Sequence, residues 1–149
     1  MHADSVEAAA GLLRARGMRL SSARRLVLEA LFAADRPITA EAIAAGLDGT
    51  LPTSDAASVY RNLEALETVG LVRHVHLGHG PGLYALAGER EREYLTCERC
   101  GAYEVVDPDA LDEVRAVLRR RFGWEARFAH FPIVGLCSEC AQLPETDLQ

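Results

Sequence analysis

The chain contains four cysteines, and all of them fall in two C-x-x-C pairs. The first C-x-x-C pair is Cys97 and Cys100, and the second is Cys137 and Cys140. A C-x-x-C pair on a tight turn lets two thiolates converge, and two such turns supply the tetrahedral set of four sulfurs that Zn²⁺ prefers. The spacing therefore predicts one closed, structural zinc site per chain, built by two segments that lie far apart in the sequence.

Membrane and secretion signals bear on the other interpretations of these cysteines. No apolar run approaches the ~18 residues that a membrane span needs, and the N-terminus lacks the pattern of a signal peptide. We therefore expect a cytosolic protein that does not contact a membrane. A cytosolic location disfavours disulfides. A thioredoxin-type dithiol and an Fe–S cluster stay open as alternatives, although neither pair opens a helix of a βαβ unit and the usual cluster spacings differ.

The charge of the chain limits its partners. The 149 residues include 16 basic and 22 acidic ones, for a net charge of −6, which argues against a nonspecific coat for nucleic acid. The first 86 residues hold eight Arg and nine acidic residues, and the other 63 hold eight Arg and thirteen acidic ones. All the basic residues are Arg, whose planar, permanently charged side chain suits phosphate and carboxylate groups.

Apolar spacing and capping residues predict an α+β fold. In the first part of the chain we expect four helices, at residues 4–15, 23–34, 40–45 and 55–67, and then two strands, at 71–77 and 83–87. Helices followed by such a hairpin are typical of a winged helix. The alternative is a small helical domain with an incidental hairpin.

The second part of the chain alternates short strands with one helix. Strands at 94–96 and 103–106 flank the first cysteine pair, a helix covers 109–122, and a last strand at about 126–134 leads to the second pair. The helix has acidic residues in its first turn and arginines in its last, which matches the helix dipole. The residues 143–149 are expected to form a loose tail.

Several motifs, in this order and spacing, resemble the ferric-uptake-regulator (Fur) family over about residues 10–140. They are GMRLSSAR at 17–24, ITAE at 38–41, SVYRNL at 58–63, GLV at 70–72 and the two cysteine pairs. The resemblance implies an N-terminal winged-helix DNA-binding domain, residues 1–87, and a C-terminal dimerisation domain, residues 88–149, with the zinc site. It also implies a homodimeric transcriptional regulator, in this interpretation a repressor, on palindromic double-stranded DNA operators.

A winged helix suggests which side chains contact DNA. The helix at 55–67 would enter the major groove, where the Tyr60 ring could pack on a thymine methyl and Arg61 could reach phosphate or guanine. The resemblance directs Arg19 to the minor groove, and further arginines could bind phosphates. The full set of predicted contacts is Arg19, Arg24, Ser58, Tyr60, Arg61, Asn62 and Arg73. Alternatively, each Arg is a solvated charge and Tyr60 belongs to the core.

The sensory metal site of most family members cannot be assembled here. Its expected His-rich run is replaced by the stretch 90–94, in which Arg92 and Tyr94 fall on ligand positions without being useful ligands. Pro37 stands where a further His is expected. In this stretch only Glu91 and Glu93 could contribute oxygen ligands.

Histidines elsewhere offer a second divalent site of unknown identity. His74 and His76 share one strand face, and with His130 they resemble the nickel-responsive branch of the family; His79 is a further candidate. Three imidazoles would suit nickel, zinc or copper. The commoner family spacing places Ala129 instead of His130 at the last position, which would turn His130 to the other face of the strand. Because the usual sensor cannot be assembled, regulation uses this altered site or is not based on metal.

Two other classes of protein stay open from the residues alone. In a zinc- or thiol-dependent enzyme, Cys97 or Cys100 would be the nucleophile and His130 the base, but the sequence supplies no third orienting group. In a zinc-stabilised adaptor, the winged helix would bind protein instead of DNA.

For the regulator, the β-branched surface of Val105, Val106 and the last strand is the expected dimer seam.

Overall fold

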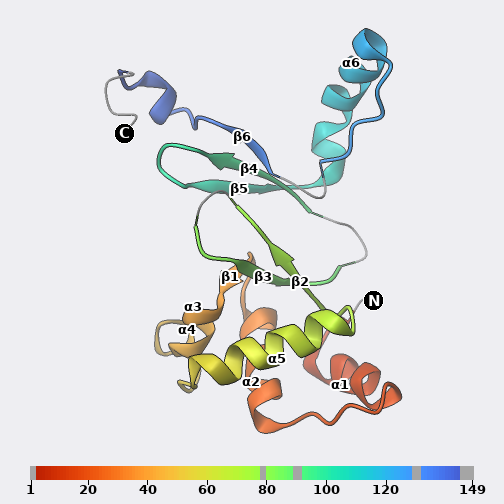
Figure 1. Cartoon of the computed structure of the whole chain (residues 1–149), viewed down its shortest axis with the longest axis vertical. Coiled ribbons are helices and arrows are strands. Elements are labelled where there is room, and N and C mark those ends of the chain that lie inside the picture. Colours follow the sequence, from red (N-terminus) through yellow and green to blue (C-terminus); the bar gives the residue numbers. More distant parts are fainter. Residues whose placement is uncertain (1–2, 78–79, 89–91, 129–131, 145–149) are drawn as a thin grey trace. The chain divides into compact units, whose positions relative to one another are not determined.

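The computed structural model of the chain describes residues 3–77, 80–88, 92–128 and 132–144 (Figure 1). It divides into two compact units. The first comprises Met1–Val75 and Pro81–Glu89, and the second comprises His76–Gly80 and Arg90–Gln149. None of the helices in the described part of the chain has the length and apolar composition of a membrane-spanning segment.

Five helices build most of the first unit: α1 (Val6–Ala15), α2 (Ser22–Ala33), α3 (Ala40–Ala44), α4 (Gly46–Gly49) and α5 (Ala56–Thr68). The helices α1, α2, α3 and α5 begin at side-chain caps, because Ser5, Ser21, Thr39 and Asp55 each accept a hydrogen bond from the backbone N–H three residues on. The four predicted helices are therefore confirmed. The short α4, where Leu47 and Asp48 adopt positive φ angles, was not predicted.

A three-stranded antiparallel sheet completes the first unit. Its strands are β1 (Ile38–Thr39), β2 (Val72–Val75) and β3 (Leu83–Leu86), in the order β1-β3-β2. The predicted hairpin is confirmed with shorter strands, and the helices of this unit lie on one side of its sheet (Figure 1). This is the winged-helix arrangement. The strand β1 is only two residues long, too short to show a sequence pattern.

The core of the first unit holds α5 in place. Val59, Leu63 and Leu66 of α5 are at most 1% exposed, and they pack in one cluster with Leu28 of α2 and Ile43 of α3. Their spacing in α5 is i, i+4, i+7, which is one stripe of a helix. Burying this stripe fixes which face of α5 remains available to a partner.

The second unit contains a three-stranded sheet and one longer helix. Its elements are β4 (Glu93–Cys97), β5 (Tyr103–Val106), the 3₁₀ turn η1 (Pro108–Leu111), α6 (Asp112–Phe122), β6 (Ile133–Gly135) and the 3₁₀ turn η2 (Cys140–Gln142). The strand order is β5-β4-β6, with β4 and β5 antiparallel and β4 and β6 parallel. The fold is thus α+β, as predicted, and α6 points away from the sheet (Figure 1).

The predicted last strand is too long. The structure begins β6 at Ile133, and residues 123–128 are not in a strand, while 129–131 lie outside the described residues. The helix α6 also starts later than predicted, because Pro108 opens a 3₁₀ turn before it. Both segments lack a strong local signal, and the extent of β6 is set by its pairing with β4.

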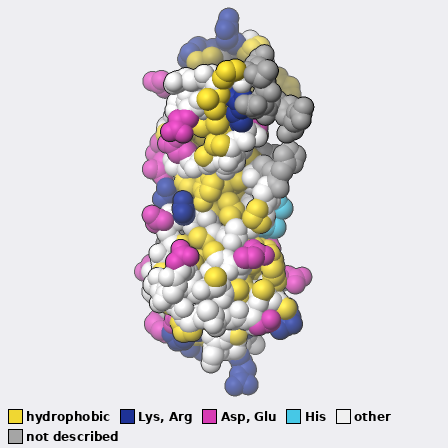
Figure 2. Space-filling view, turned by 90° about the vertical axis from the view of Figure 1, so that its left-hand side faces the viewer, with side chains coloured by type: hydrophobic (Ala, Val, Ile, Leu, Met, Phe, Trp, Pro, Cys, Tyr) yellow, Lys and Arg dark blue, Asp and Glu magenta, His cyan; other side chains and the backbone are white. Residues whose placement is uncertain are grey.

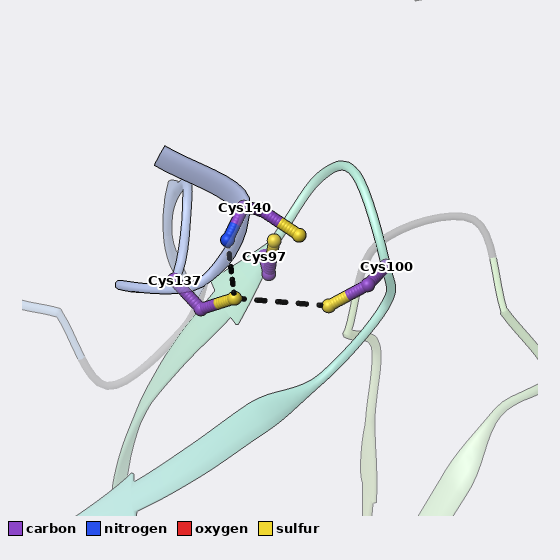
Figure 3. A group of neighbouring side chains, drawn as sticks. All are labelled: Cys97, Cys100, Cys137 and Cys140. Carbon is purple, nitrogen blue, oxygen red and sulfur yellow. Dashed lines mark hydrogen bonds between the residues drawn. The ribbon is translucent and has the colours of Figure 1, made fainter. Parts of the chain in front are cut away.

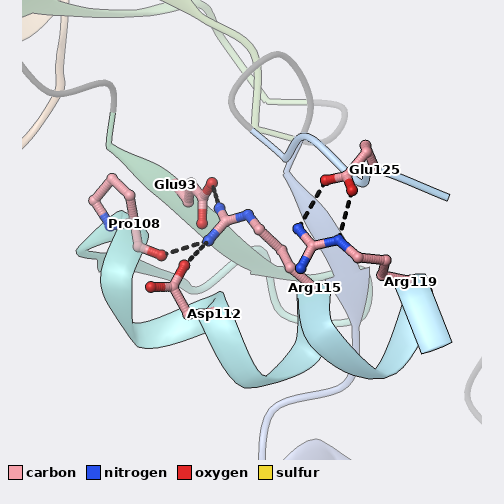
Figure 4. A network of polar contacts seen from close by, with 6 residues as sticks. All are labelled: Glu93, Pro108, Asp112, Arg115, Arg119 and Glu125. Carbon is pink, nitrogen blue, oxygen red and sulfur yellow. Dashed lines mark hydrogen bonds and ion pairs between the residues drawn. The ribbon is translucent and has the colours of Figure 1, made fainter.

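A buried ion pair joins β4 to α6 (Figure 4). The Glu93 side chain is 4% exposed and the Arg115 side chain 18% exposed, and their charged groups are in direct contact. The Arg115 guanidinium also donates to the carbonyl oxygen of Pro108 at 2.6 Å and to a carboxylate oxygen of Asp112 at 2.9 Å. Glu93, predicted as an oxygen ligand for a second metal, is therefore held by a cation of the chain itself.

Candidate metal centre and nucleic-acid interface

The four cysteines meet at one end of the second sheet, as Figure 3 shows. Parallel pairing of β4 with β6 places Cys97 opposite Gly135, so that the turns which follow the two strands lie side by side. The backbone N–H of Glu98, in the first turn, donates to the carbonyl of Gly135 at 2.9 Å. The register of β4 with β6 thus brings the two pairs together.

Each turn aims its two thiols at the same point. In the first turn the N–H of Gly101 donates to the Cys97 carbonyl at 2.9 Å, and Gly101 has a φ of +74°, a conformation that favours glycine. In the second turn the N–H of Cys140 donates to the Cys137 sulfur at 3.5 Å. These local hydrogen bonds orient the sulfurs inward.

The distances among the sulfurs suit a tetrahedral metal. All four Sγ atoms lie within 4.8 Å of one another, and the Cys100 and Cys137 sulfurs are 3.9 Å apart. A tetrahedral Zn²⁺ with bonds of about 2.3 Å requires sulfurs about 3.8 Å apart, whereas a disulfide requires about 2.05 Å. The predicted convergence of the four sulfurs is confirmed, and the group could hold a metal ion.

The thiols of the group differ in acidity. Backbone N–H groups of Cys100 and Cys137 lower the pKa of Cys97 to about 6, while burial raises the pKa of Cys140 to about 12. Near pH 7, Cys97 readily supplies a thiolate, and Cys140 keeps its proton unless a cation replaces it. A metal that binds all four sulfurs therefore releases protons, and its affinity falls as the pH falls.

Arg99 joins the two turns, a role that the sequence did not predict. It lies between the cysteines of the first pair, and its guanidinium donates to the carbonyl of Cys140 at 3.0 Å and to that of Pro144 at 2.6 Å. Its position inside a C-x-x-C pair is the signal that could have found it. A side chain of the first turn thereby holds carbonyls of the second turn and of the segment that follows it.

Replacing Arg99 with Ala is expected to weaken metal retention. Residues that orient metal ligands typically change affinity by about 10–100-fold when removed. Competition with a colorimetric zinc chelator would show faster and more complete loss of metal from the variant than from the unaltered chain. Glu98→Ala, at an exposed position of the same turn, is the matched control, and equal loss from both variants would contradict this role for Arg99.

The exposed surface of α5 carries two of the predicted base-reading side chains. Tyr60 is 43% exposed, and Arg61 beside it is exposed. Arg19, on the turn before α2, is exposed as well, whereas Ser58 and Arg73 are half-buried. The alternative that Tyr60 belongs to the core is not what the structure shows.

The structure changes the expected role of two predicted DNA contacts. Asn62, predicted as a DNA contact, does not face outward: it is 9% exposed, and its amide donates to the Ser58 carbonyl at 2.9 Å. Its position, three residues after Val59 and one before Leu63, puts it on the core stripe. Arg24 is half-buried, and its guanidinium donates to the backbone carbonyl of Arg19, so it supports the turn that presents Arg19.

The histidines predicted as sensory ligands are only partly described. His74 lies in β2, its ring stacked on that of Tyr84, and His76 follows the strand and is exposed. His79, His130 and Glu91 lie outside the described residues. Within the ranges that the structure describes, the four cysteines form the one group of three or more His, Cys, Asp or Glu side chains arranged for a metal. The second site stays a prediction.

A winged-helix unit and a unit with four convergent thiols in one chain define a winged-helix protein with a group that could hold a metal ion. The chain belongs to the ferric uptake regulator family, whose model matches residues 15–131. It is 28% identical over 142 residues to the peroxide operon regulator of Bacillus subtilis, covering 95% of this chain and 97% of that protein. It is 23% identical over 131 residues to the ferric uptake regulation protein of Campylobacter jejuni, covering 87% and 83%.

Solved structures confirm the fold. The Helicobacter pylori ferric uptake regulator, described as having three functional metal binding sites, superposes with a TM-score of 0.69 at 19% identity over 93% of this chain and 92% of that one. A zinc-bound manganese uptake regulator gives 0.66 at 18% identity, covering 89% and 98%. The predicted family is confirmed, and the family consists of regulators, so the chain is not an enzyme. The resemblance to the nickel-responsive branch is not tested by these matches.

Proposed function

We propose that this chain is a cytoplasmic transcriptional repressor that acts as a homodimer on palindromic DNA operators and holds one structural zinc per protomer. The observation that carries the proposal is the orientation of α5. Its apolar stripe is buried, and Tyr60 and Arg61 are exposed beside it. In this proposal residues 1–87 bind DNA and residues 88–149 dimerise.

The proposed DNA contacts divide by chemistry. With α5 in the major groove, the Tyr60 ring packs on a thymine methyl and Arg61 bonds to guanine or phosphate. Arg19 enters the minor groove, supported by Arg24, while Arg73 contacts phosphate and Ser58 lies at the start of the helix. Asn62 is left out of the interface because its side chain is buried and bonded to the Ser58 carbonyl of the same helix.

The exposed apolar surface of the second unit supports dimerisation. Val114, Val117 and Phe122 of α6 are 44%, 41% and 66% exposed, and Val134 of β6 is 57% exposed. A hollow of about 370 Å³ beside them is lined by Leu118, Phe122, Trp124 and Ala126. Figure 2 shows hydrophobic side chains reaching the surface between acidic ones. A second copy would cover such a surface, and α6 would extend the predicted seam at Val105 and Val106.

Two DNA-binding units in a dimer compensate for the weak electrostatic attraction of each unit to DNA. The first 86 residues carry eight Arg against nine acidic residues, so one DNA-binding unit attracts phosphate poorly. A dimer doubles the phosphate contacts and matches the two-fold symmetry of a palindrome. Affinity for DNA is therefore proposed to depend on dimerisation.

Control of this regulator is proposed not to use the usual family sensor. Arg92 and Tyr94 stand at ligand positions, and Glu93 is bound by Arg115. The remaining candidate for a second divalent ion is the set of His74, His76 and His130, with His79 and Glu91 as further donors. Titration of the zinc-loaded protein with nickel, zinc or copper salts, followed by operator binding, tests this set against regulation without a metal.

The DNA-binding proposal is tested with Arg61→Ala and Tyr60→Ala. A duplex is first selected from a random pool with the unaltered chain, and binding is then measured across salt concentrations. Loss of a base contact at Arg61 is expected to weaken binding about 5–150-fold, and loss of a phosphate contact to lower the salt slope by about one per protomer.

The matched control is Arg14→Ala, which removes an exposed Arg of α1. It is expected to change operator binding less than twofold. The proposal fails if the unaltered chain binds no duplex in a salt-dependent way, or if the α5 variants bind as the unaltered chain does. Binding to a protein in place of DNA would favour the adaptor.

A further inference from the structure

Tyr60 is fixed by contacts from two other elements of the first unit. Its hydroxyl donates to a carboxylate oxygen of Glu41, in the first turn of α3, at 2.6 Å. Its ring meets the ring of Tyr84, from β3, edge to face, with centroids 6.5 Å apart and planes at 77°. An exposed tyrosine that simply lay in solvent would sample several rotamers. Here both ends of the side chain are held.

The second of these contacts is itself rigid. Tyr84 is 8% exposed, and the His74 ring stacks on it with centroids 4.6 Å apart and planes at 2°. The two residues are direct cross-strand partners in the β2–β3 hairpin. Gly82 lies close to the Nε2 edge of the His74 ring, because a Cβ at this position would be 2.0 Å from the His74 Nε2 atom. The ring against which Tyr60 packs therefore has little room to move.

The hydrogen bond between Glu41 and Tyr60 is charge-assisted. It lowers the pKa of Glu41 and raises the pKa of Tyr60, so near neutral pH a carboxylate accepts from a protonated phenol. A carboxylate on a surface that faces phosphates weakens DNA binding by repulsion. The Glu41 carboxylate therefore costs affinity for DNA. What it contributes in return is the hydrogen bond, which orients the Tyr60 ring and engages the Tyr60 hydroxyl.

We infer that Glu41 is a positioning residue for DNA reading, an inference that rests on the proposed DNA-binding function. Because the Tyr60 hydroxyl is bonded to Glu41, it does not donate a hydrogen bond to a DNA phosphate, a contact that every DNA sequence offers. The ring is then presented in one orientation, in which it reads the methyl group of a thymine. Glu41 thus contributes sequence preference without touching a base.

The experiment measures how much a single thymine methyl contributes to binding. In the duplex selected by the unaltered chain, each thymine is replaced in turn by deoxyuridine, which removes only the 5-methyl group. For the unaltered chain, replacing one particular thymine of each half-site is expected to weaken binding about fourfold, the effect of removing one buried methyl group. We call this loss of affinity the uracil penalty. A merely structural role of Glu41 would leave this uracil penalty unchanged.

Three variants separate the parts of the contact. Glu41→Ala and Tyr60→Phe each remove the hydrogen bond, and both are expected to reduce the uracil penalty to less than twofold. The double variant is expected to behave as either single variant does. Glu41→Gln keeps an acceptor for the hydroxyl, so it should keep the penalty while binding all duplexes more tightly.

Glu64→Ala is the matched control, since it removes a carboxylate from α5 and leaves the bond between Glu41 and Tyr60 in place. Circular dichroism and thermal unfolding of each variant verify the fold. The inference is overturned if Glu41→Ala keeps the full penalty, or if no thymine shows one with the unaltered chain. If the unaltered chain binds no duplex, the proposed function itself fails.

Discussion

Replacing Cys97 with Ser is expected to abolish metal binding and to unfold the second unit. In small metal-held folds the free energy of zinc binding, on the order of 10 kcal/mol, is folding free energy. Elemental analysis should find about one zinc per unaltered chain and none per variant. Trp124, the one tryptophan of the chain, is 74% exposed, so unfolding of the second unit in urea is followed by hydrogen exchange at the backbone amides of β4 and β5 instead of by fluorescence.

The control for this prediction is Ser138→Ala, at an exposed position between the cysteines of the second pair. It should retain zinc and unfold at the same urea concentration as the unaltered chain. A Cys97→Ser chain that keeps its zinc, or that loses zinc without any change in unfolding, would show that the four thiols do not stabilise this unit.

Replacing Arg115 with Met is expected to destabilise the second unit by about 3 to 5 kcal/mol. The change leaves Glu93, which is 3% exposed, buried without its cation, and an unpaired buried charge costs about this much. Urea unfolding followed by hydrogen exchange at the backbone amides of β4 and β5 measures the loss. Arg119→Met is the control, because the pair that Arg119 forms with Glu125 is exposed, and exposed pairs contribute little.

A second variant distinguishes a lost charge partner from lost packing. Replacing Glu93 with Leu together with Arg115→Met removes both charges, so most of the lost stability should return. If the double variant is no more stable than Arg115→Met alone, the effect came from the packing of the arginine stem, and the interpretation of Figure 4 as a buried ion pair that matters for stability would be wrong.

Signals within a few residues allowed the helices to be predicted. Ser21, Thr39 and Asp55 cap their helices through their own side chains, and such caps can be read from sequence. The strands β1 and β6 could not be placed in this way. Each has two or three residues, and each exists because a distant strand, β3 or β4, supplies its hydrogen-bond partners.

The candidate site was predictable where chemistry repeats at fixed spacing. The two C-x-x-C pairs allowed the group of four thiols to be predicted from the sequence. The bonds of Arg99, of Arg115 and of Glu41 with Tyr60 were not predicted, because a charged residue in a sequence does not indicate its partner. The burial of Asn62 could have been found, since positions 59, 62, 63 and 66 form one helical stripe.

The parallel pairing of β4 with β6 also sets the order in which the chain can mature during synthesis. Leu95 and its partner Ile133 are separated by 38 residues, which a ribosome takes about 2 to 8 seconds to translate. The first unit is complete at residue 89, so it can fold while Cys97 and Cys100 still await the second turn. A newborn chain can therefore form α5 before its four thiols can converge.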